Sequence, residues 1–80
     1  MKTNDLKKGD KVRLRNGWYA TLKDNLRGNI RLATVEGIVT ETGSIYSHDI
    51  VAKVESDGRE VPIEHTTSQL ECKARDEALS

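Results

Sequence analysis

Few residues in this chain of 80 could do covalent or metal chemistry. Ser47, His48 and Asp49 have the residue types of a hydrolytic relay, but neighbours on an extended strand point to opposite faces and cannot form one as they stand. Two histidines, His48 and His65, without a third ligand at the usual spacing make a poor metal site. A single Cys72 excludes a disulfide framework. The sequence therefore predicts no enzyme, metal site or cofactor, and a hydrolase built on His48 would need a carboxylate brought beside it by the fold.

Basic and aromatic side chains make a stronger case, which is for binding an anion. Cations give affinity for phosphates, and exposed aromatic rings stack on bases. In this hypothesis the cations supply charge, Trp18 and Tyr19 stack, and Tyr46 and His48 line a second polar surface. The alternatives are a solvated basic strand and packing of Trp18 across the barrel mouth against the C-terminal helix. The candidate ligand-binding residues are Arg13, Arg15, Trp18, Tyr19, Lys23, Arg27, Arg31, Tyr46 and His48.

The distribution of charge supports the same hypothesis. The 13 basic and 13 acidic residues cancel. Residues 1–40 nevertheless carry nine Lys or Arg against four acids, whereas residues 41–80 carry four against nine. Such an asymmetry indicates an anionic partner for the first half. The alternative is that the two halves attract each other, within one chain or between chains.

Turn signals divide the chain into short strands. Gly9-Asp10, Asn16-Gly17 and Asp57-Gly58 are typical of turns. No apolar run is long enough to span a membrane, and residues 1–10 lack the apolar stretch of a signal peptide. Short strands at this spacing predict a small barrel or sandwich. The expected strands are residues 11–15, 19–23, 29–40, 44–54 and 59–63.

The first hairpin is predicted from the alternation of apolar and basic residues. A three-residue loop sets Leu14 opposite Ala20 and Val12 opposite Leu22, so that four apolar residues share one face. A two-residue loop at the same turn would bury fewer of them together. The preferred register leaves Trp18 at the hairpin tip. The outer face then carries Arg13, Arg15, Tyr19 and Lys23.

The last hairpin is predicted to turn on two residues, Asp57 and Gly58. Its Pro62 has no backbone N–H and suits an edge strand. The predicted pairs are Val54 with Val61 and Ala52 with Ile63.

In the long middle strand, the apolar residues switch from one face to the other along its length. Ile30 and Leu32 stand at even-numbered positions, and Ala33 and Val35 stand at odd-numbered positions. This predicts either a bulge near Thr34 or a strand that is covered on both faces.

After residue 65 the sequence takes a helical period. Ser68 and Glu71 fit a capping box, and Leu70, Ala74 and Ala78 repeat at four-residue spacing. The expected helix has a narrow apolar stripe that either caps one barrel opening or meets a partner helix.

The amount of apolar material predicts a small core. Fifteen of the eighteen Leu, Ile and Val residues fall between Val12 and Ile63, where the core is expected. So few aliphatic side chains barely offset the cost of ordering the backbone, so hydrogen-bonded strands or a second copy of the chain must supply the rest. A homo-oligomer is one outcome, and a chain that folds alone is the other.

Two short patterns resemble known proteins. Lys7-x-Gly9-Asp10-x-Val12-x-Leu14 followed by Asn16-Gly17 resembles the opening of small SH3-like barrels of the KOW type, with Gly37-x-Val39 in place of the family's later Gly-x-Val. Residues 43–50 are similar to small barrel proteins encoded by tailed bacteriophages. This second resemblance implies a host-takeover or counter-defence role in the cytoplasm of a bacterial host.

The sequence predicts an all-β, five-stranded SH3-like barrel in residues 1–65 and a short α-helix in residues 66–80. The expected function is non-catalytic binding of a phosphate-bearing ligand, either a nucleic acid or a nucleotide. In a counter-defence role, the protein would sequester a nucleotide signal of the host's defence. The alternative is a protein-interaction module that inhibits a host protein through a sheet edge or the acidic helix. No membrane partner is expected.

Overall fold

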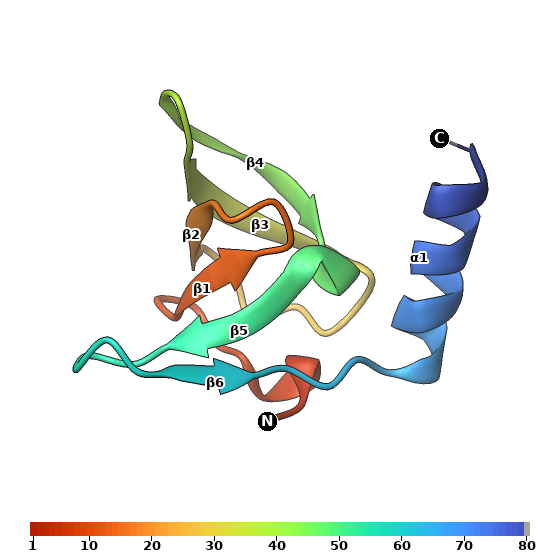
Figure 1. The fold of residues 1–80 in the computed structure, drawn as a ribbon, viewed down its shortest axis with the longest axis horizontal. Helices are drawn as coiled ribbons and strands as arrows, with labels where there is room; N and C mark the ends of the chain where they lie inside the picture. Colours follow the sequence, from red (N-terminus) through yellow and green to blue (C-terminus); the bar gives the residue numbers. More distant parts are fainter. Residues whose placement is uncertain (80) are drawn as a thin grey trace.

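The computed structural model describes residues 1–79 as one sheet of six antiparallel strands and a C-terminal helix (Figure 1). The mainly β body and the terminal helix predicted from the sequence are confirmed, but the sheet has six strands rather than five. A 3₁₀ turn divides the predicted run of residues 44–54, and the preceding strand already begins at Thr40. The elements are η1 (Thr3–Asp5), β1 (Lys11–Leu14), β2 (Tyr19–Leu22), β3 (Ile30–Glu36), β4 (Thr40–Tyr46), η2 (Ser47–Asp49), β5 (Ile50–Val54), β6 (Glu60–Pro62) and α1 (Thr67–Leu79).

The strand order in the sheet is β4-β3-β2-β1-β5-β6. Strands β1 to β4 pair with their neighbours in sequence, and η2 then turns the chain back so that β5 pairs with β1. The two edge strands are therefore β4 and β6. Pro62 lies in the edge strand β6, where a missing N–H is tolerated.

The first hairpin has the predicted faces but a different register. Val12 lies opposite Ala20 rather than Leu22. Gly17 donates to the Leu14 carbonyl at 2.9 Å, and the Leu14 N–H donates to the Trp18 carbonyl at 2.7 Å. Gly17 has φ 91°, a left-handed conformation that closes the turn with three residues immediately after Leu14. Because the shift is by two residues, the predicted inward side chains stay inward. These are Val12, Leu14, Ala20 and Leu22, and all are buried.

The predicted register of the last hairpin was wrong by one residue. Val54 lies opposite Glu60 rather than Val61. The turn again has three residues because Gly58 takes φ 88° and donates to the Glu55 carbonyl at 2.9 Å. Because side chains alternate along a strand, a one-residue shift in register changes which side chains of the two strands share a face. The observed pairs are Ala52–Pro62, Lys53–Val61 and Val54–Glu60, where Ala52–Ile63 and Val54–Val61 were predicted.

Strand β3 pairs regularly over its whole length, without a bulge near Thr34. Arg31 and Ala33 point inward and are buried, whereas Ile30 and Leu32 lie on the outer face and are 46% and 41% exposed. Both predicted alternatives were therefore wrong. The strand is unbroken, and its outer face presents apolar side chains to solvent.

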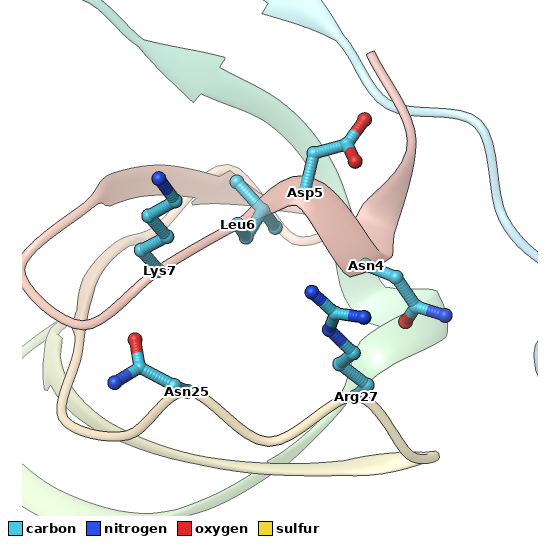
Figure 2. A pocket seen from close by; sticks show the side chains of 6 residues that line it. All are labelled: Asn4, Asp5, Leu6, Lys7, Asn25 and Arg27. Atoms are coloured by element: carbon cyan, nitrogen blue, oxygen red, sulfur yellow. The ribbon is translucent and has the colours of Figure 1, made fainter.

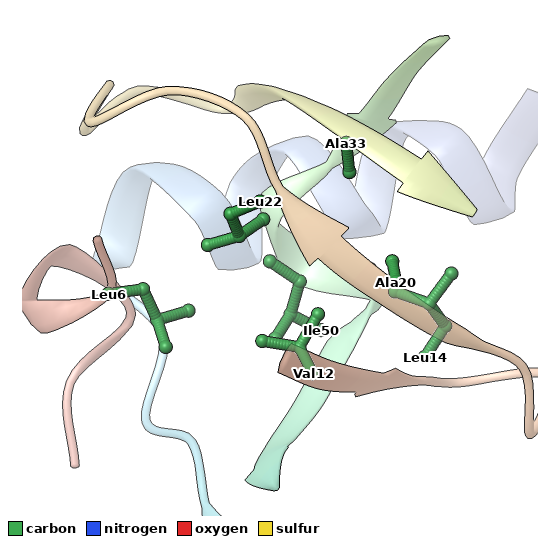
Figure 3. Packing of buried hydrophobic residues seen from close by; sticks show 7 residues of the cluster. All are labelled: Leu6, Val12, Leu14, Ala20, Leu22, Ala33 and Ile50. Atoms are coloured by element: carbon green, nitrogen blue, oxygen red, sulfur yellow. The ribbon is translucent and has the colours of Figure 1, made fainter. Parts of the chain in front are cut away.

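The core is small and lies between the central strands (Figure 3). Leu6 joins it from the segment before β1, outside the range in which the sequence placed the core. Larger apolar side chains, such as Ile38 with 93% exposure, remain outside. The buried hydrophobic residues are Leu6, Val12, Leu14, Ala20, Leu22, Ala33, Ile50 and Ala52.

Helix α1 begins with a capping box formed by Thr66 and Gln69. Thr66 Oγ1 accepts from the Gln69 N–H at 3.2 Å, and Gln69 Oε1 accepts from the Thr66 N–H at 2.9 Å. This reciprocal pair lies two residues before the predicted Ser68–Glu71 pair. Both pairs fit the Ser/Thr-x-x-Glu/Gln pattern of a capping box, and the hydrogen bonds form in the Thr66–Gln69 pair.

The apolar stripe of α1 faces away from the sheet. Leu70 is 50% exposed, and Ala74 and Ala78 are exposed, whereas Gln69 is buried and donates to Asn4 Oδ1 at 3.4 Å. The stripe therefore does not cap a barrel opening, and the helix docks through polar side chains. Within residues 1–79, no helix has the length and apolar character needed to cross a membrane.

Candidate functional site

The outer face of the first hairpin is largely occupied by contacts within the chain. Arg13 Nε donates to Glu60 Oε1. That hydrogen bond and the charge of Glu60 raise the pKa of Arg13 above its ordinary value. Lys11 Nζ lies 5.1 Å from the centre of the Tyr19 ring, at a distance typical of a cation–π contact. This face is thus less available to an anion than its sequence suggested.

Arg15 lies in the hairpin turn and faces acidic side chains. Its Nη2 is 2.9 Å from Asp49 Oδ1 and 3.9 Å from Asp76 Oδ2, and its Nη1 is 2.9 Å from Glu77 Oε1. Two of these acids belong to α1. The basic first half and the acidic second half therefore pair within one chain, which accounts for part of the charge asymmetry.

Trp18 lies at the hairpin tip, as predicted, and is 42% exposed. Its indole packs on the backbone of Gly37, where an added Cβ would lie 2.5 Å from the ring. The same side of the molecule carries Val35, Ile38 and Val39. The ring therefore packs against the β3–β4 turn, while the alternative from the sequence was packing against the C-terminal helix.

The three residue types of a hydrolytic relay form the turn η2. Ser47 Oγ donates to the Gly28 carbonyl at 2.7 Å and accepts from Arg31 Nε at 3.0 Å. Its hydroxyl is thus engaged by groups other than His48. The arrangement favours a structural role for Ser47.

His48 is buried, and its ring stacks on Tyr46 with a centroid distance of 4.9 Å and an interplanar angle of 14°. His48 Nε2 lies 3.6 Å from Asp76 Oδ2 and 3.7 Å from Asp49 Oδ1. Carboxylates do come near this ring. Because the ring is closed off from solvent, however, a substrate has no direct access to it, and only Tyr46 of the pair presents a 40% exposed surface.

A hollow lies between the N-terminal segment and the β2–β3 loop and forms a groove (Figure 2). Its volume is about 520 Å³. Arg27 and Asn25 point from the loop toward the N-terminal segment. We call this hollow the N-terminal groove; its lining residues are Asn4, Asp5, Leu6, Lys7, Asn25 and Arg27.

Side-chain to backbone hydrogen bonds hold both walls of the groove. Asp24 accepts from the Leu26 N–H at 3.1 Å and from the Leu32 N–H at 2.9 Å, which fixes the loop to the beginning of β3. Asn25 Oδ1 accepts from the Lys8 N–H at 2.7 Å and ties the loop to the N-terminal segment. Asn25, which lines the groove, also carries an amide NH₂ donor.

The acidic and basic side chains around the groove differ in their partners. Its acids accept from backbone N–H groups: Asp5 from Lys2 at 3.2 Å, and Asp10 from Lys7 at 2.8 Å. The side chains of Lys7 and Arg27 form no ion pair with any residue in the described part of the chain. The groove is thus lined by two cations that have no ion-pair partner and by one carboxylate, Asp5.

Arg31 lies buried beside this groove, with no exposed surface. Its Nη2 donates to Asn4 Oδ1 at 3.1 Å and to the Thr3 carbonyl at 3.4 Å. Within residues 1–79, Nη1 has no hydrogen-bond partner and no carboxylate pairs with the guanidinium. Burial lowers the pKa of Arg31, an effect opposed by Asp24 and increased by Arg27. Arg31 is therefore linked to the groove lining by its hydrogen bond to Asn4.

The structure separates the nine predicted site residues into several places. Arg27 lines the groove and Arg31 lies behind it. Lys23 is exposed just after β2, and Tyr46 ends β4. The others lie on the first hairpin or, in the case of His48, beside α1. Sequence reasoning missed Asn4, Lys7 and Asn25, although Lys7 opens the motif that resembles the KOW type. No group of three or more His, Cys, Asp or Glu in residues 1–79 is placed to hold a metal ion.

Comparison of the chain with family models, with curated proteins and with solved structures gave no match.

Proposed function

We propose that this protein is a non-catalytic module that binds a phosphate-bearing ligand in the N-terminal groove. The observation that carries the proposal is the buried Arg31, a cation without a carboxylate partner, directly behind Asn4 in the groove wall. A buried charge is costly unless it is paired. An anion bound in the groove beside Asn4 would bring a negative charge close to Arg31 and so lower the cost of burying it.

The exposed groups of the groove suit the same ligand. Lys7 and Arg27 offer charge and hydrogen-bond donors, and Asn25 adds amide donors. A guanidinium binds phosphate oxygens in a bidentate manner. A groove of about 520 Å³ falls within the range of small-molecule sites, so it suits a nucleotide or the terminal phosphate of a nucleic acid.

This proposal moves the binding site away from the first hairpin. Arg13 and Arg15 already contact carboxylates, and Trp18 and Tyr19 do not line the groove. Stacking by those two aromatic rings is therefore not part of the proposed mechanism. Phosphate recognition by Lys7 and Arg27 is its main element.

We further propose that the sheet is an SH3-like barrel and that the protein acts as a phage counter-defence protein in the bacterial cytoplasm by sequestering a nucleotide signal. The return of β5 to β1 after a four-stranded meander supports the barrel. The resemblance of residues 43–50 to small phage barrel proteins supports the cellular role. The barrel assignment is independent of the phosphate site, whereas the cellular role depends on nucleotide binding there.

Calorimetric titration with inorganic phosphate, AMP, a cyclic dinucleotide, and short single-stranded DNA and RNA tests the proposal. We expect saturable binding that weakens with salt and falls roughly tenfold to hundredfold in Arg27→Glu, since charged hydrogen bonds contribute about 1.5–3 kcal/mol. Arg59→Glu is the matched control because it changes net charge equally at the exposed β5–β6 turn. Equal losses in both variants, or no binding of any probe, would reject the groove as the site.

The alternative function is a protein-interaction module that inhibits a host protein. The outward apolar stripe of α1, with Leu70 half exposed, favours it. Removal of residues 67–80 should then abolish partner binding while leaving phosphate binding intact. Salt separates the two functions as well, since an apolar interface weakens little as ionic strength rises.

A further inference from the structure

The edge of β4 is free along its whole length. Within residues 1–79, β4 pairs only with β3. The Ser47 N–H donates to the Asn29 carbonyl and the Gly37 N–H donates to the Val39 carbonyl. Since backbone groups alternate in direction along a strand, the odd-numbered residues of β4 bond to β3 and the even-numbered ones point outward. The outward residues are Thr40, Thr42, Ser44 and Tyr46.

This edge lacks the usual protection against pairing. Natural edge strands are commonly short, or they carry Lys, Pro or a bulge. The opposite edge, β6, has three residues and contains Pro62. By contrast, β4 has seven residues, carries a single charged residue, Glu41, contains no Lys, Arg or Pro, and pairs with β3 without a bulge. The contrast indicates that the free edge of β4 is suited to pairing with a strand of another chain.

A second copy of the same strand fits this edge. In an antiparallel pair the outward groups of one copy must meet outward groups of the other. A two-fold axis at Gly43 meets this condition, because it sets Thr42 opposite Ser44 of the second copy and Thr40 opposite Tyr46. All seven residues then take part. Axes at Thr42 or Ser44 also satisfy the alternation but leave part of the strand unpaired.

The same arrangement brings together apolar side chains that a monomer exposes. Ile38 and Val39, at the turn before β4, are 93% and 61% exposed. Ile30 and Tyr46, at the other end of the strand, are 46% and 40% exposed. The two-fold axis at Gly43 places the turn of one copy beside the Tyr46 end of the other. Burial there would add to a core that has only eight buried hydrophobic residues, three of them Ala.

We propose that the protein forms a homodimer in which the two β4 strands pair antiparallel about Gly43 and join two sheets into one. This interface lies on β4 and is independent of the N-terminal groove. It gives the homo-oligomer that the sequence allows a defined surface and register. Closure by a two-fold axis limits the assembly to two copies.

Sedimentation equilibrium tests the dimer and its register together. The wild-type protein should have about twice the 8.9 kDa chain mass at micromolar concentration. In the variant Thr42→Lys with Ser44→Lys, like charges face each other across the axis, and dimer affinity should fall roughly tenfold or more. In Thr42→Lys with Ser44→Glu, opposite charges face each other, so the dimer should be retained.

Far-UV circular dichroism of all three proteins controls for folding, because the substituted residues are exposed in the monomer. A wild-type protein that stays monomeric at hundreds of micromolar would overturn the proposal. Equal dimerisation by the two double variants would overturn the register. A mass of three copies or more would overturn the two-fold axis.

Discussion

The Asn4 side chain accepts a hydrogen bond from Arg31 at 3.1 Å, across 27 positions of sequence. Asn4 also lines the N-terminal groove, whereas Arg31 has no exposed surface. One amide thus joins a buried cation to an open site. In the proposed phosphate site, the charge of Arg31 polarises the Asn4 amide, because hydrogen bonds polarise one another strongly at low dielectric.

Replacement of Arg31 by Met should separate ligand binding from stability. The substitution removes a buried charge that has no carboxylate partner, but it also leaves the acceptors on Thr3, Asn4 and Ser47 without this donor. Because the two effects oppose each other, the free energy of unfolding should fall by no more than about 1–3 kcal/mol. Affinity for AMP should fall several-fold because the charge behind Asn4 is lost. Urea denaturation and calorimetry measure the two effects. A loss of several kcal/mol in stability would show that the guanidinium is a structural element instead.

Thr66, rather than Ser68, should be the residue that stabilises the start of α1. Thr66→Ala removes the acceptor for the Gln69 N–H and should lower stability by about 0.5–2 kcal/mol. Ser68→Ala is the matched control, with an expected change within about 0.5 kcal/mol. Thermal unfolding followed by circular dichroism compares them. The reverse order would show that the capping box lies at Ser68 and Glu71.

Gly37 should tolerate no side chain while the indole of Trp18 keeps its place. A Cβ at Gly37 would lie 2.5 Å from the ring, so Gly37→Ala must displace Trp18 and should cost about 1–3 kcal/mol. The displaced indole should emit at longer wavelength as it enters water. Gly28→Ala meets nothing within 4 Å and serves as the control. Unchanged emission from the Gly37 variant would contradict the observed packing.

Arg15 should hold α1 against the body of the protein. Arg15→Met removes contacts with Asp76 and Glu77, and since half-exposed ion pairs contribute about 0.2–1 kcal/mol each, amide exchange in α1 should speed up several-fold. The effect should shrink at high salt, where these pairs are screened. Arg59→Met, which removes an ion pair within a turn, should leave α1 unchanged. Equal exchange in both variants would mean that other contacts hold the helix.

The sequence predicted strand faces better than strand registers. Alternation identifies which residues point inward, and this survives a two-residue shift such as that of Val12 and Ala20. Register depends on where the loop begins and how long it is. The first loop has the predicted three residues but begins one residue earlier, and the left-handed Gly58 lengthens the last loop from two residues to three. In the last hairpin the shift was by one residue. Val54 therefore faced Glu60 instead of Val61.

The burial of Arg31 could not be predicted from its neighbours. Ile30 and Leu32 are more apolar, and hydrophobicity alone would have turned them inward. Arg31 is buried because Thr3, Asn4 and Ser47 supply its acceptors, and these lie 16 to 28 positions away. The groove was missed for the same reason. Its walls come from two segments that only the fold brings together.

The most direct test of the phosphate site is a titration of ¹⁵N-labelled protein with AMP, followed by amide chemical shifts at constant ionic strength. The site predicts saturable shifts at its two walls, with the largest changes at Asn4, Lys7, Asn25 and Arg27. These shifts should disappear in Arg27→Glu and persist in Arg59→Glu. Shifts confined to the Arg13 and Tyr19 face, or no saturable shift at millimolar AMP, would contradict the claim that the N-terminal groove binds phosphate.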